Sequence, residues 1–481
     1  MLFNSLTYLS LLFFVVILFW NLSGRSRFFL IFISSLTFYG FWKIEFIILL
    51  LFSTISDWLI SHQIVKHENK IKKKFLLLSL IINLSLLFYF KYLIFFSENT
   101  FGLLNLMGFK IDPILLKIIL PLGISFYTFQ TISYTVDVYR KVIKPEKDFI
   151  VYACYVTFFP QLVAGPILRA REVISQFKKT NNFNWDYISD GFRRVLYGLF
   201  LKVVLADNIA PLVNSGFDLS LETLSAIDVW TLAFLFGLQI YFDFSGYSHI
   251  ALGSAKMIGI SFPENFNFPY LANSPKDFWQ RWHISLSSWV RDYIYLPLLG
   301  VKYQVSSKGG LANATLNKND QKPLFITWGL MGLWHGANWT FILWGLYHSL
   351  IIFIFRKILI INQNLKIKVN SYFGWLLTLP LMMLSWIPFR AESISDTIEM
   401  WGKVLNPLKY DSLNLNENVY LITFVLMLGV IMTSYIKNKI QNSKSLNVIF
   451  INIGDTLFIA LIFYLTFIFL RPINQFIYFQ F

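Results

Sequence analysis

The sequence is poor in cysteine and in charge. A single cysteine, Cys154, occurs in 481 residues, so no intramolecular disulfide can form. Charged residues make up only 14% of the chain, whereas hydrophobic residues make up 56% and aromatic residues 19%. This composition is typical of a membrane protein with many spans, and it excludes a soluble globular fold. Cys154 lies in an apolar run and is predicted to pack as a small buried hydrophobic residue.

The motifs of several large enzyme classes are also absent. The chain contains no Gly-rich phosphate loop ending in Lys-Ser/Thr, no GxSxG nucleophile turn and no HExxH zinc helix. We expect no bound metal. The net charge of +15 is carried by short basic runs between apolar segments, with no nucleic-acid-binding module around them. These runs are predicted to be cytoplasmic loops that face anionic lipid, and no nucleic acid partner is expected.

The apolar runs predict about 10 to 12 transmembrane helices. The first run, from Leu2 to Trp20, lacks a basic start and a small-residue cleavage site, so we interpret it as a span and not as a signal peptide. A span from Phe75 to Phe96 is followed by a polar, external-looking loop. The Lys-rich loops at 61–74 and 360–368 are predicted to be cytoplasmic, which places both termini outside.

The middle of the chain departs from regular spans. Prolines and glycines break the apolar runs around 121–123 and 160–166, and the stretch 261–278 is rich in proline and asparagine. Such breaks are tolerated at membrane depth only where protein or a water-filled cavity satisfies the backbone. We therefore expect an all-α polytopic membrane protein with re-entrant and interfacial helices around a central cavity. Residues 1–481 would form one membrane domain, with its site within about 114–390.

Two histidines lie in otherwise apolar, aromatic-rich segments. A helix is predicted to start at Ser274 and Pro275 and to carry His283 on a polar stripe. A second segment, interpreted as one helix, places Trp328, His335 and Trp339 on one stripe beside Gly329, Gly332 and Gly336, and puts His348 on the opposite face from His335. Ionisable residues at membrane depth are costly and usually functional, although a hydrogen-bonded packing role stays open for each histidine.

These segments resemble the membrane-bound O-acyltransferase family. The resemblance covers most of the chain and rests on PLGISFYTFQTISYTVDVYR at 121–140, FFPQLVAGPI at 158–167, YFDFSGYSHIALG at 241–253, DFWQRWHISLSSWVRDYIYLPLLG at 277–300 and GLWHGANWTFILWG at 332–345. WIPFRA at 386–391 and the terminal FIYFQF resemble the bacterial branch that includes alginate and peptidoglycan O-acetyltransferase membrane subunits. His249 departs from this branch, where Asp is expected at that position. The resemblance therefore implies a functional role for Asp243 of the same motif and not for His249.

The resemblance implies a reaction and a set of site residues. An acyl group, most simply acetyl, would move from a cytoplasmic thioester donor (acetyl-CoA or an acyl carrier) toward hydroxyl groups of a cell-envelope or exported polysaccharide. His335 would be the catalytic general base and His283 a second catalytic residue, and no bound cofactor is implied. The expected substrate-binding residues are Trp328, Trp334, Asn338, Trp339, Arg281 and Asp243. A packing role for the tryptophans, and an ion pair between Arg281 and Asp292, are alternative interpretations.

The resemblance also implies a location and partners. The protein would lie in a bacterial cytoplasmic (inner) membrane, in contact with lipid, and would pass the acyl group to an extracytoplasmic, serine-esterase-like acetyltransferase partner. No external stretch is predicted to be long or folded enough to bind a polysaccharide, since the longest candidate, 391–418, is predicted to be a short helix followed by a polar loop. Two alternatives stay open. One is transfer of D-alanine to teichoic acid, and the other is a non-enzymatic transporter or channel, which would more often show two related halves.

Overall fold

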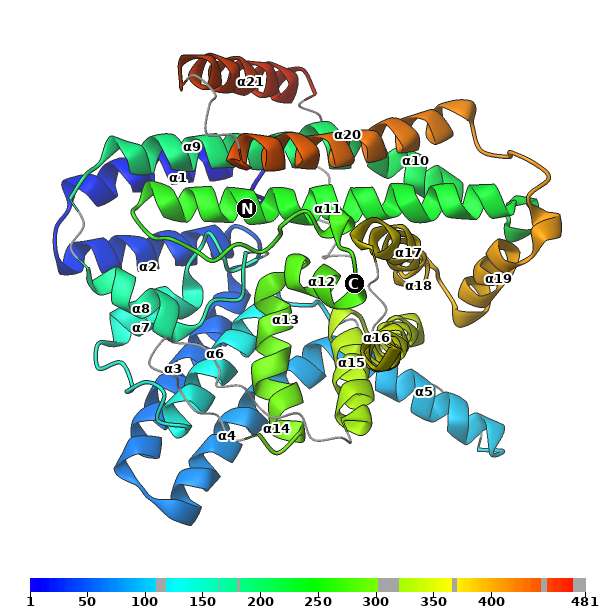
Figure 1. The fold of residues 1–481 in the computed structure, drawn as a ribbon. Coiled ribbons are helices and arrows are strands. Elements are labelled where there is room, and N and C mark those ends of the chain that lie inside the picture. The colour runs from blue at the N-terminus through cyan, green and yellow to red at the C-terminus, as the bar shows by residue number, and fades with distance from the viewer. Residues whose placement is uncertain are drawn as a thin grey trace. The chain divides into compact units, whose positions relative to one another are not determined.

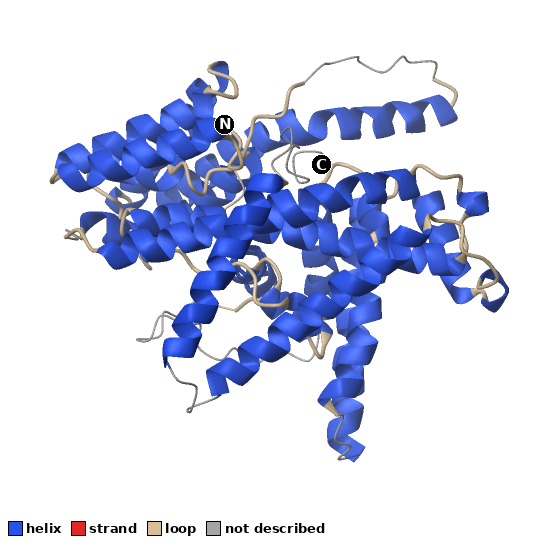
Figure 2. Cartoon of the chain, turned by 90° about the horizontal axis from the view of Figure 1, so that it is seen from above, coloured by secondary structure: helices blue, strands red, loops and turns tan. Residues whose placement is uncertain are grey.

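The regular structure of the chain is helical. The computed structural model describes residues 1–109, 118–163, 165–179, 182–301, 320–365, 370–442 and 448–469, and within these ranges no strand occurs (Figures 1 and 2). The described helices that are long and apolar enough to cross a membrane confirm an all-α polytopic membrane protein. They are α3 (Glu45–Lys66); α4, η1 and α5 (Asn69–Leu106); α9, η2 and α10 (Trp185–Phe217); α11 (Ala226–Met257); Trp339–Ile361 of α16 (Trp339–Leu365); and α17 and α18 (Ser371–Arg390).

Shorter apolar helices add to these spans, namely Leu6–Asn21 (α1), Glu417–Thr433 of α20 and Thr456–Ile468 of α21. The total number of crossings, about 10 to 12, stays a prediction. The terminal FIYFQF, together with Lys366 and Lys368 of the second basic loop, lies outside the described residues.

The chain divides into two compact units, and each is discontinuous in sequence. The first is drawn mainly from Met1–Phe192 and Ala251–Pro263, and the second from Arg193–Ile250, Glu264–Leu299 and Leu316–Phe481. The first unit contains α1, α2 (Arg25–Gly40), α3 to α5, α6 (Ile124–Tyr139), α7 (Phe149–Thr157) and α8 (Ala170–Lys178). Both histidine motifs belong to the second unit.

Buried polar contacts hold α3, α4 and α6 together in the first unit. The carboxylate of Asp57 is fully buried and accepts hydrogen bonds from Ser79 Oγ at 2.5 Å and Asn83 Nδ2 at 2.7 Å. The amide oxygen of Asn83 accepts in turn from Ser53 Oγ at 2.9 Å and Thr131 Oγ1 at 3.1 Å. These bonds replace the water that a buried carboxylate loses.

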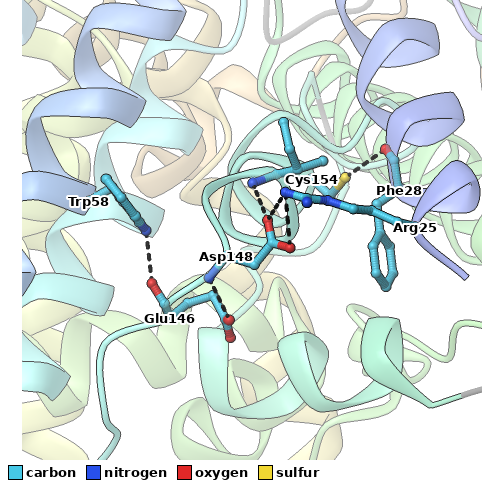
Figure 3. A network of polar contacts seen from close by, with 7 residues as sticks. Arg25, Phe28, Trp58, Glu146, Asp148 and Cys154 are labelled. Atoms are coloured by element: carbon cyan, nitrogen blue, oxygen red, sulfur yellow. Dashed lines mark hydrogen bonds and ion pairs between the residues drawn. The ribbon is translucent and has the colours of Figure 1, made fainter.

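A second polar network anchors the start of α7 (Figure 3). Asp148 is the N-cap of this helix and accepts from Ile150 N at 2.9 Å, while Arg25 lies 3.5 Å from its carboxylate. Further along α7, Cys154 is fully buried and its thiol donates to the carbonyl of Phe28 at 3.1 Å. Burial raises the pKa of the Cys154 thiol, so the predicted packing role of this cysteine is confirmed.

The loop expected after Phe96 is instead helical. α4 and α5, joined by the π-helical turn η1 (Phe88–Tyr92), continue to Leu106. Ser97, Asn99 and Thr100 look like loop residues, but each side chain donates to a carbonyl three or four residues back, at 2.7–2.8 Å. These bonds satisfy the polar groups along the helix, so the prediction that a loop starts directly after Phe96 was wrong.

The predicted interruptions of the middle region are confirmed. α6 begins after Gly123, whose φ is 71°, and a Cβ at this position would collide with the carbonyl of Leu162. α7 ends at Thr157, and an irregular stretch leads to α8, whose Val173 and Phe177 are buried, as expected of an amphipathic helix. The stretch 261–274 contains only the short 3₁₀ turn η4 (Pro269–Leu271), so it is not a span.

The second unit contains the two histidine motifs and a short helix, α19 (Ile394–Leu405) (Figure 1). α9 begins and α11 ends within the first unit, and the rest of each belongs to the second. A capping box at Ser393 and Asp396 starts α19, which confirms the helix expected in 391–418. The remaining elements are α9 (Trp185–Leu199), η2 (Phe200–Ala206), α10 (Asp207–Phe217), η3 (Leu221–Thr223), α11, α12 (Pro275–Arg281), α13 (Ile284–Val290), η5 (Arg291–Tyr295), α14 (Leu296–Leu298), α15 (Gln321–His335), α16, α17 (Ser371–Leu384), α18 (Ile387–Arg390), η6 (Pro407–Lys409), α20 (Glu417–Asn442) and α21 (Val448–Ile468).

Candidate active site

The first histidine motif forms two short helices. α12 begins where the sequence predicts, because Ser274 Oγ accepts from the backbone N–H of Asp277 at 3.1 Å and caps the helix. The chain then breaks at His283, whose backbone is left-handed with a φ of 41° and a ψ of 54°. A non-glycine residue adopts this conformation only when its surroundings hold it there. The predicted continuous helix, with His283 on a polar stripe, was therefore wrong.

Asn265 is the residue that holds this break. Its backbone carbonyl accepts from the N–H of Ile284 at 3.0 Å, and its side-chain Oδ1 accepts from the N–H of Ser285 at 3.2 Å. The imidazole of His283 is fully buried, with Nδ1 at 3.1 Å from the same Oδ1 and the ring of Phe244 edge-on at 4.6 Å. Burial lowers the pKa of His283 to about 3, so the ring is neutral at pH 7.

The second histidine motif is a helical hairpin and not one helix. α15 ends at His335, the chain turns at Gly336–Asn338, and α16 runs back beside α15 (Figure 1). The side chain of Asn338 is used at the turn, since its Oδ1 accepts from the N–H of Thr340 at 3.1 Å. The stripe predicted for a single helix was therefore wrong, and Trp339, at the start of α16, is 50% exposed.

Glycines allow the two helices of the hairpin to approach closely. A Cβ on Gly332 would collide with the carbonyl of Phe341, and a Cβ on Gly345 would collide with the carbonyl of Trp328. A Cβ on Gly329, by contrast, would meet open space among the described residues. The expected close backbone approach is thus made by Gly332 and not by Gly329, and the partner is the other arm of the same hairpin.

His335 and His283 are connected through aromatic contacts. His335 is 4% exposed, and its ring lies 4.9 Å from those of Trp334 and Trp344 and 5.3 Å from that of Phe389. Trp334 also lies 6.4 Å from the ring of His283. The structure therefore places the two predicted catalytic residues around one indole, in a buried part of the second unit.

Sequence reasoning missed a third histidine in this aromatic cluster. His348 is 1% exposed and packs against Trp344 at 4.7 Å, Trp279 at 5.0 Å and Trp328 at 5.4 Å. Neither of its ring nitrogens has a hydrogen-bond partner in the described structure. The turn signal Gly-Ala-Asn at 336–338 could have revealed the hairpin that brings His348 back toward His335.

Two further predicted residues, Trp328 and Arg281, have partners other than the two catalytic candidates. Trp328 is 9% exposed and contacts His348, 5.4 Å away between ring centroids. Arg281 pairs with Asp277, four residues earlier, at 2.7 Å, whereas Asp292 pairs with Arg291 at 2.7 Å, so Arg281 and Asp292 have separate partners.

Asp243 belongs to a buried ion cluster. Lys202 Nζ lies 2.7 Å from its carboxylate and 2.8 Å from that of Asp207, and the exposure of the lysine is 2%. The π-helical turn η2 brings Lys202 and Asp207, five residues apart, onto one side. These contacts place three charged groups together in the interior of the second unit. His249, on the same helix as Asp243, packs edge-on against Tyr197 at 4.9 Å.

Comparison with known proteins agrees with this arrangement. Residues 143–379, which include both histidine motifs, match the family described as MBOAT, the membrane-bound O-acyltransferases. A probable alginate O-acetylase, AlgI, of Pseudomonas aeruginosa is 36% identical over 404 residues, which cover 83% of this chain and 74% of the relative. A peptidoglycan O-acetyltransferase of Helicobacter pylori is 35% identical over 395 residues, covering 76% and 72% of the two chains.

A more distant relative covers less of the chain. The teichoic acid D-alanyltransferase of Bacillus subtilis is 30% identical over 260 residues, or 53% of this chain and 62% of the relative. One assignment is supported by the apolar spans, by the paired histidine motifs and by the relatives matched over most of the chain. The chain belongs to the membrane-bound O-acyltransferase family and is a membrane-embedded O-acyltransferase.

Proposed function

We propose that this enzyme moves an acetyl group from a thioester donor toward hydroxyl groups of a cell-envelope or exported polysaccharide. The names of the relatives matched over most of the chain, alginate O-acetylase and peptidoglycan O-acetyltransferase, support acetyl as the group and a polysaccharide as the destination. The D-alanyltransferase relatives match over little more than half of the chain, which favours acetyl over D-alanyl.

The observation that carries the proposal is the buried cluster in which Trp334 contacts both His283 and His335. The reaction forms a C–O bond between the acceptor hydroxyl and the acyl carbonyl carbon, and it breaks the C–S bond of the thioester. His335 takes the hydroxyl proton as the C–O bond forms and returns it to the departing thiolate. An imidazole suits both steps because its proton affinity lies near neutrality.

Burial of this site favours acyl transfer over hydrolysis. Both histidines are at most 4% exposed, and aromatic rings pack against each of them. A site closed to bulk water protects the thioester from hydrolysis and strengthens each polar interaction within it. The same aromatic rings limit the space beside His335, which favours a small acyl group.

The donor, partner and location complete the proposal. Acetyl-CoA or an acyl carrier on the cytoplasmic side would supply the thioester, and the protein would lie in a bacterial cytoplasmic membrane. An extracytoplasmic, serine-esterase-like partner would receive the acetyl group on its serine and pass it to the polymer. The shortness of α19 and the loop after it, the longest external candidate, supports the need for such a partner.

Purified protein in liposomes tests the proposal. Radiolabelled acetyl-CoA, an acetylated carrier and a D-alanylated carrier are offered in turn, with the polysaccharide and with or without the partner. We expect acetyl transfer to the polymer only when the partner is present. D-alanyl transfer alone would overturn the assignment of the acyl group, and polymer acetylation without any partner would overturn the relay. Ion or solute flux without acyl transfer would point to the transporter alternative.

A further inference from the structure

The orientation of the Asn265 side chain is fixed by its neighbours. Its Oδ1 lies 3.2 Å from the backbone N–H of Ser285 and 2.9 Å from the Ser285 hydroxyl. A backbone N–H can only donate, so the atom that faces it must be the carbonyl oxygen and not the NH₂ group. The amide nitrogen then points the other way, where Nδ2 lies 3.3 Å from Ser248 Oγ.

This orientation determines the tautomer of His283. Nδ1 of the imidazole lies 3.1 Å from the same Oδ1, and an amide oxygen can only accept. An unprotonated Nδ1 would place two lone pairs against each other in a buried site. The proton of the neutral ring is therefore on Nδ1, and Nε2 carries the lone pair.

Nε2 of His283 is buried without a partner. It has no hydrogen-bond partner among the residues that the structure describes, and the exposure of the whole side chain is 0%. Leaving a buried acceptor unsatisfied is costly, so such atoms in a native protein call for an explanation. The rings nearest to the imidazole are those of Phe244 and Trp334, and His335 lies beyond Trp334.

We infer that Asn265 is a positioning residue that holds His283 in its Nδ1–H tautomer, so that the Nε2 lone pair accepts a hydrogen bond from an O–H or N–H group of a substrate. The inference rests on the proposed function for the assignment of the cluster as the active site. Two sources can supply the donor group. One is the acceptor hydroxyl, and the other is the amide-containing arm that carries the thioester.

The left-handed backbone of His283 agrees with this role. The same Asn265 that accepts from Nδ1 also accepts from the N–H groups of Ile284 and Ser285, so one residue sets the helix break and the ring orientation together. Orientation of a reacting imidazole by a fixed acceptor on its other nitrogen is a common arrangement in enzymes. The side chains that contact the ring are those of Phe244, Asn265, Ser285 and Trp334, and none of them titrates near neutral pH. His335, which does, contacts the far partner Trp334.

The direct test is nitrogen NMR of the membrane-reconstituted enzyme with ¹⁵N-labelled histidine, assigned by comparison with His283→Gln. The inference requires Nδ1 of His283 to be protonated and Nε2 to be bare at neutral pH. A protonated Nε2 would overturn it. This readout does not depend on activity, so it separates failure of the inference from failure of the proposed acetyl transfer.

Three variants give the functional test. Asn265→Asp keeps the acceptor atoms but adds a negative charge that stabilises the imidazolium, and Asn265→Leu removes the acceptor. Asn267→Asp is the matched control, because Asn267 lies in the same segment but is exposed. We expect Asn265→Leu to lower the acyl transfer rate by about 10²-fold, the size of a general acid–base effect.

The pH profile of Asn265→Asp distinguishes positioning from support of the fold. The carboxylate raises the pKa of His283, so as the pH falls the ring gains its second proton and Nε2 can no longer accept. The pH at which the transfer rate falls on the acid side should therefore rise by about one unit or more, and the rate should recover at higher pH. An unmoved limb, or an equal shift in Asn267→Asp, would overturn the inference.

The Michaelis constants distinguish the two sources of the donor group. An increase in the KM of the thioester in Asn265→Leu assigns the contact to the donor's arm, whereas an increase in the KM of the acceptor, or a fall in kcat alone, assigns it to the hydroxyl. Asn265→Leu can fail to fold, but Asn265→Asp preserves every accepted bond and keeps the test decisive. Unchanged constants in a folded Asn265→Leu would count against a substrate contact altogether.

Discussion

The rings of His335 and Trp344 pack edge to face, with centroids 4.9 Å apart and an interplanar angle of 80°. Trp344 also packs against His348, 4.7 Å away, and both contacts come from the hairpin of α15 and α16. Trp344 is 1% exposed and is thus a buried ring shared by the predicted base and a second buried imidazole.

Replacement of Trp344 should damage both stability and chemistry. Trp344→Ala leaves a cavity beside His335 and is expected to cost about 3 to 5 kcal/mol of unfolding free energy. Trp339→Ala is the control: this tryptophan is half exposed, and the expected loss is below about 1 kcal/mol. Thermal unfolding in detergent measures both effects, and equal losses would show that Trp344 has no special packing role.

Two glycine-to-alanine substitutions in α15 should change the stability of the protein in opposite directions. Gly332→Ala pushes a methyl group into the carbonyl of Phe341, and such overpacking costs about 1 to 3 kcal/mol. Gly329→Ala meets no described atom within 4 Å and should gain up to about 1 kcal/mol from better helix propensity. The two melting temperatures, measured side by side, test the hairpin directly. A stable Gly332→Ala would mean that α15 and α16 are not in close contact.

The sequence predicted the class of fold and the identity of the central residues better than their local geometry. Composition and apolar runs were enough for an all-α membrane protein, and Ser274 capped α12 as expected. Periodicity failed where the helix broke. His283 takes a left-handed conformation because Asn265, 18 residues earlier, accepts its neighbours' N–H groups, and no local pattern encodes that contact.

The site illustrates the same limit of sequence reasoning. Trp328 and Trp339 were assigned to one face of a continuous helix, yet the turn at Gly336–Asn338 separates them and brings His348 into the cluster. Lys202 was also missed, although a lone cation inside an apolar run is a signal for a buried ion pair. Partners from distant segments decide both features, and helical periodicity describes only one helix at a time.

Loss of the charge on Lys202 should lower the free energy of unfolding more than loss of an exposed cation does. Lys202→Met leaves the buried Asp243 and the partly buried Asp207 without their shared partner, and breaking a buried ion pair costs about 3 to 5 kcal/mol. Arg194→Met removes a pair with Glu264 that is partly exposed and is expected to cost at most about 1 kcal/mol. Abundance in membranes and thermal unfolding report the difference, and a fully stable Lys202→Met would contradict a structural role for the cluster.

Topology can be tested with single cysteines, because the native thiol is buried. In a Cys154→Ala background, Lys70→Cys and Lys366→Cys should resist a membrane-impermeant reagent in intact cells, whereas a cysteine added after Phe481 should react. The physical reason is the excess of Lys in both loops, which favours the cytoplasmic side. Labelling of the two loops together with protection of the terminus would show that the orientation is the reverse of the predicted one.

The most direct test of the central claim is acyl transfer by His335→Ala, with His283→Ala alongside, at matched membrane abundance. If His335 is the general base, its loss should lower the rate by at least about 10²-fold while the protein stays folded. His283→Ala should lower it less. Near-normal transfer by a folded His335→Ala enzyme would contradict the account and would return His335 to a packing role among Trp334, Trp344 and Phe389.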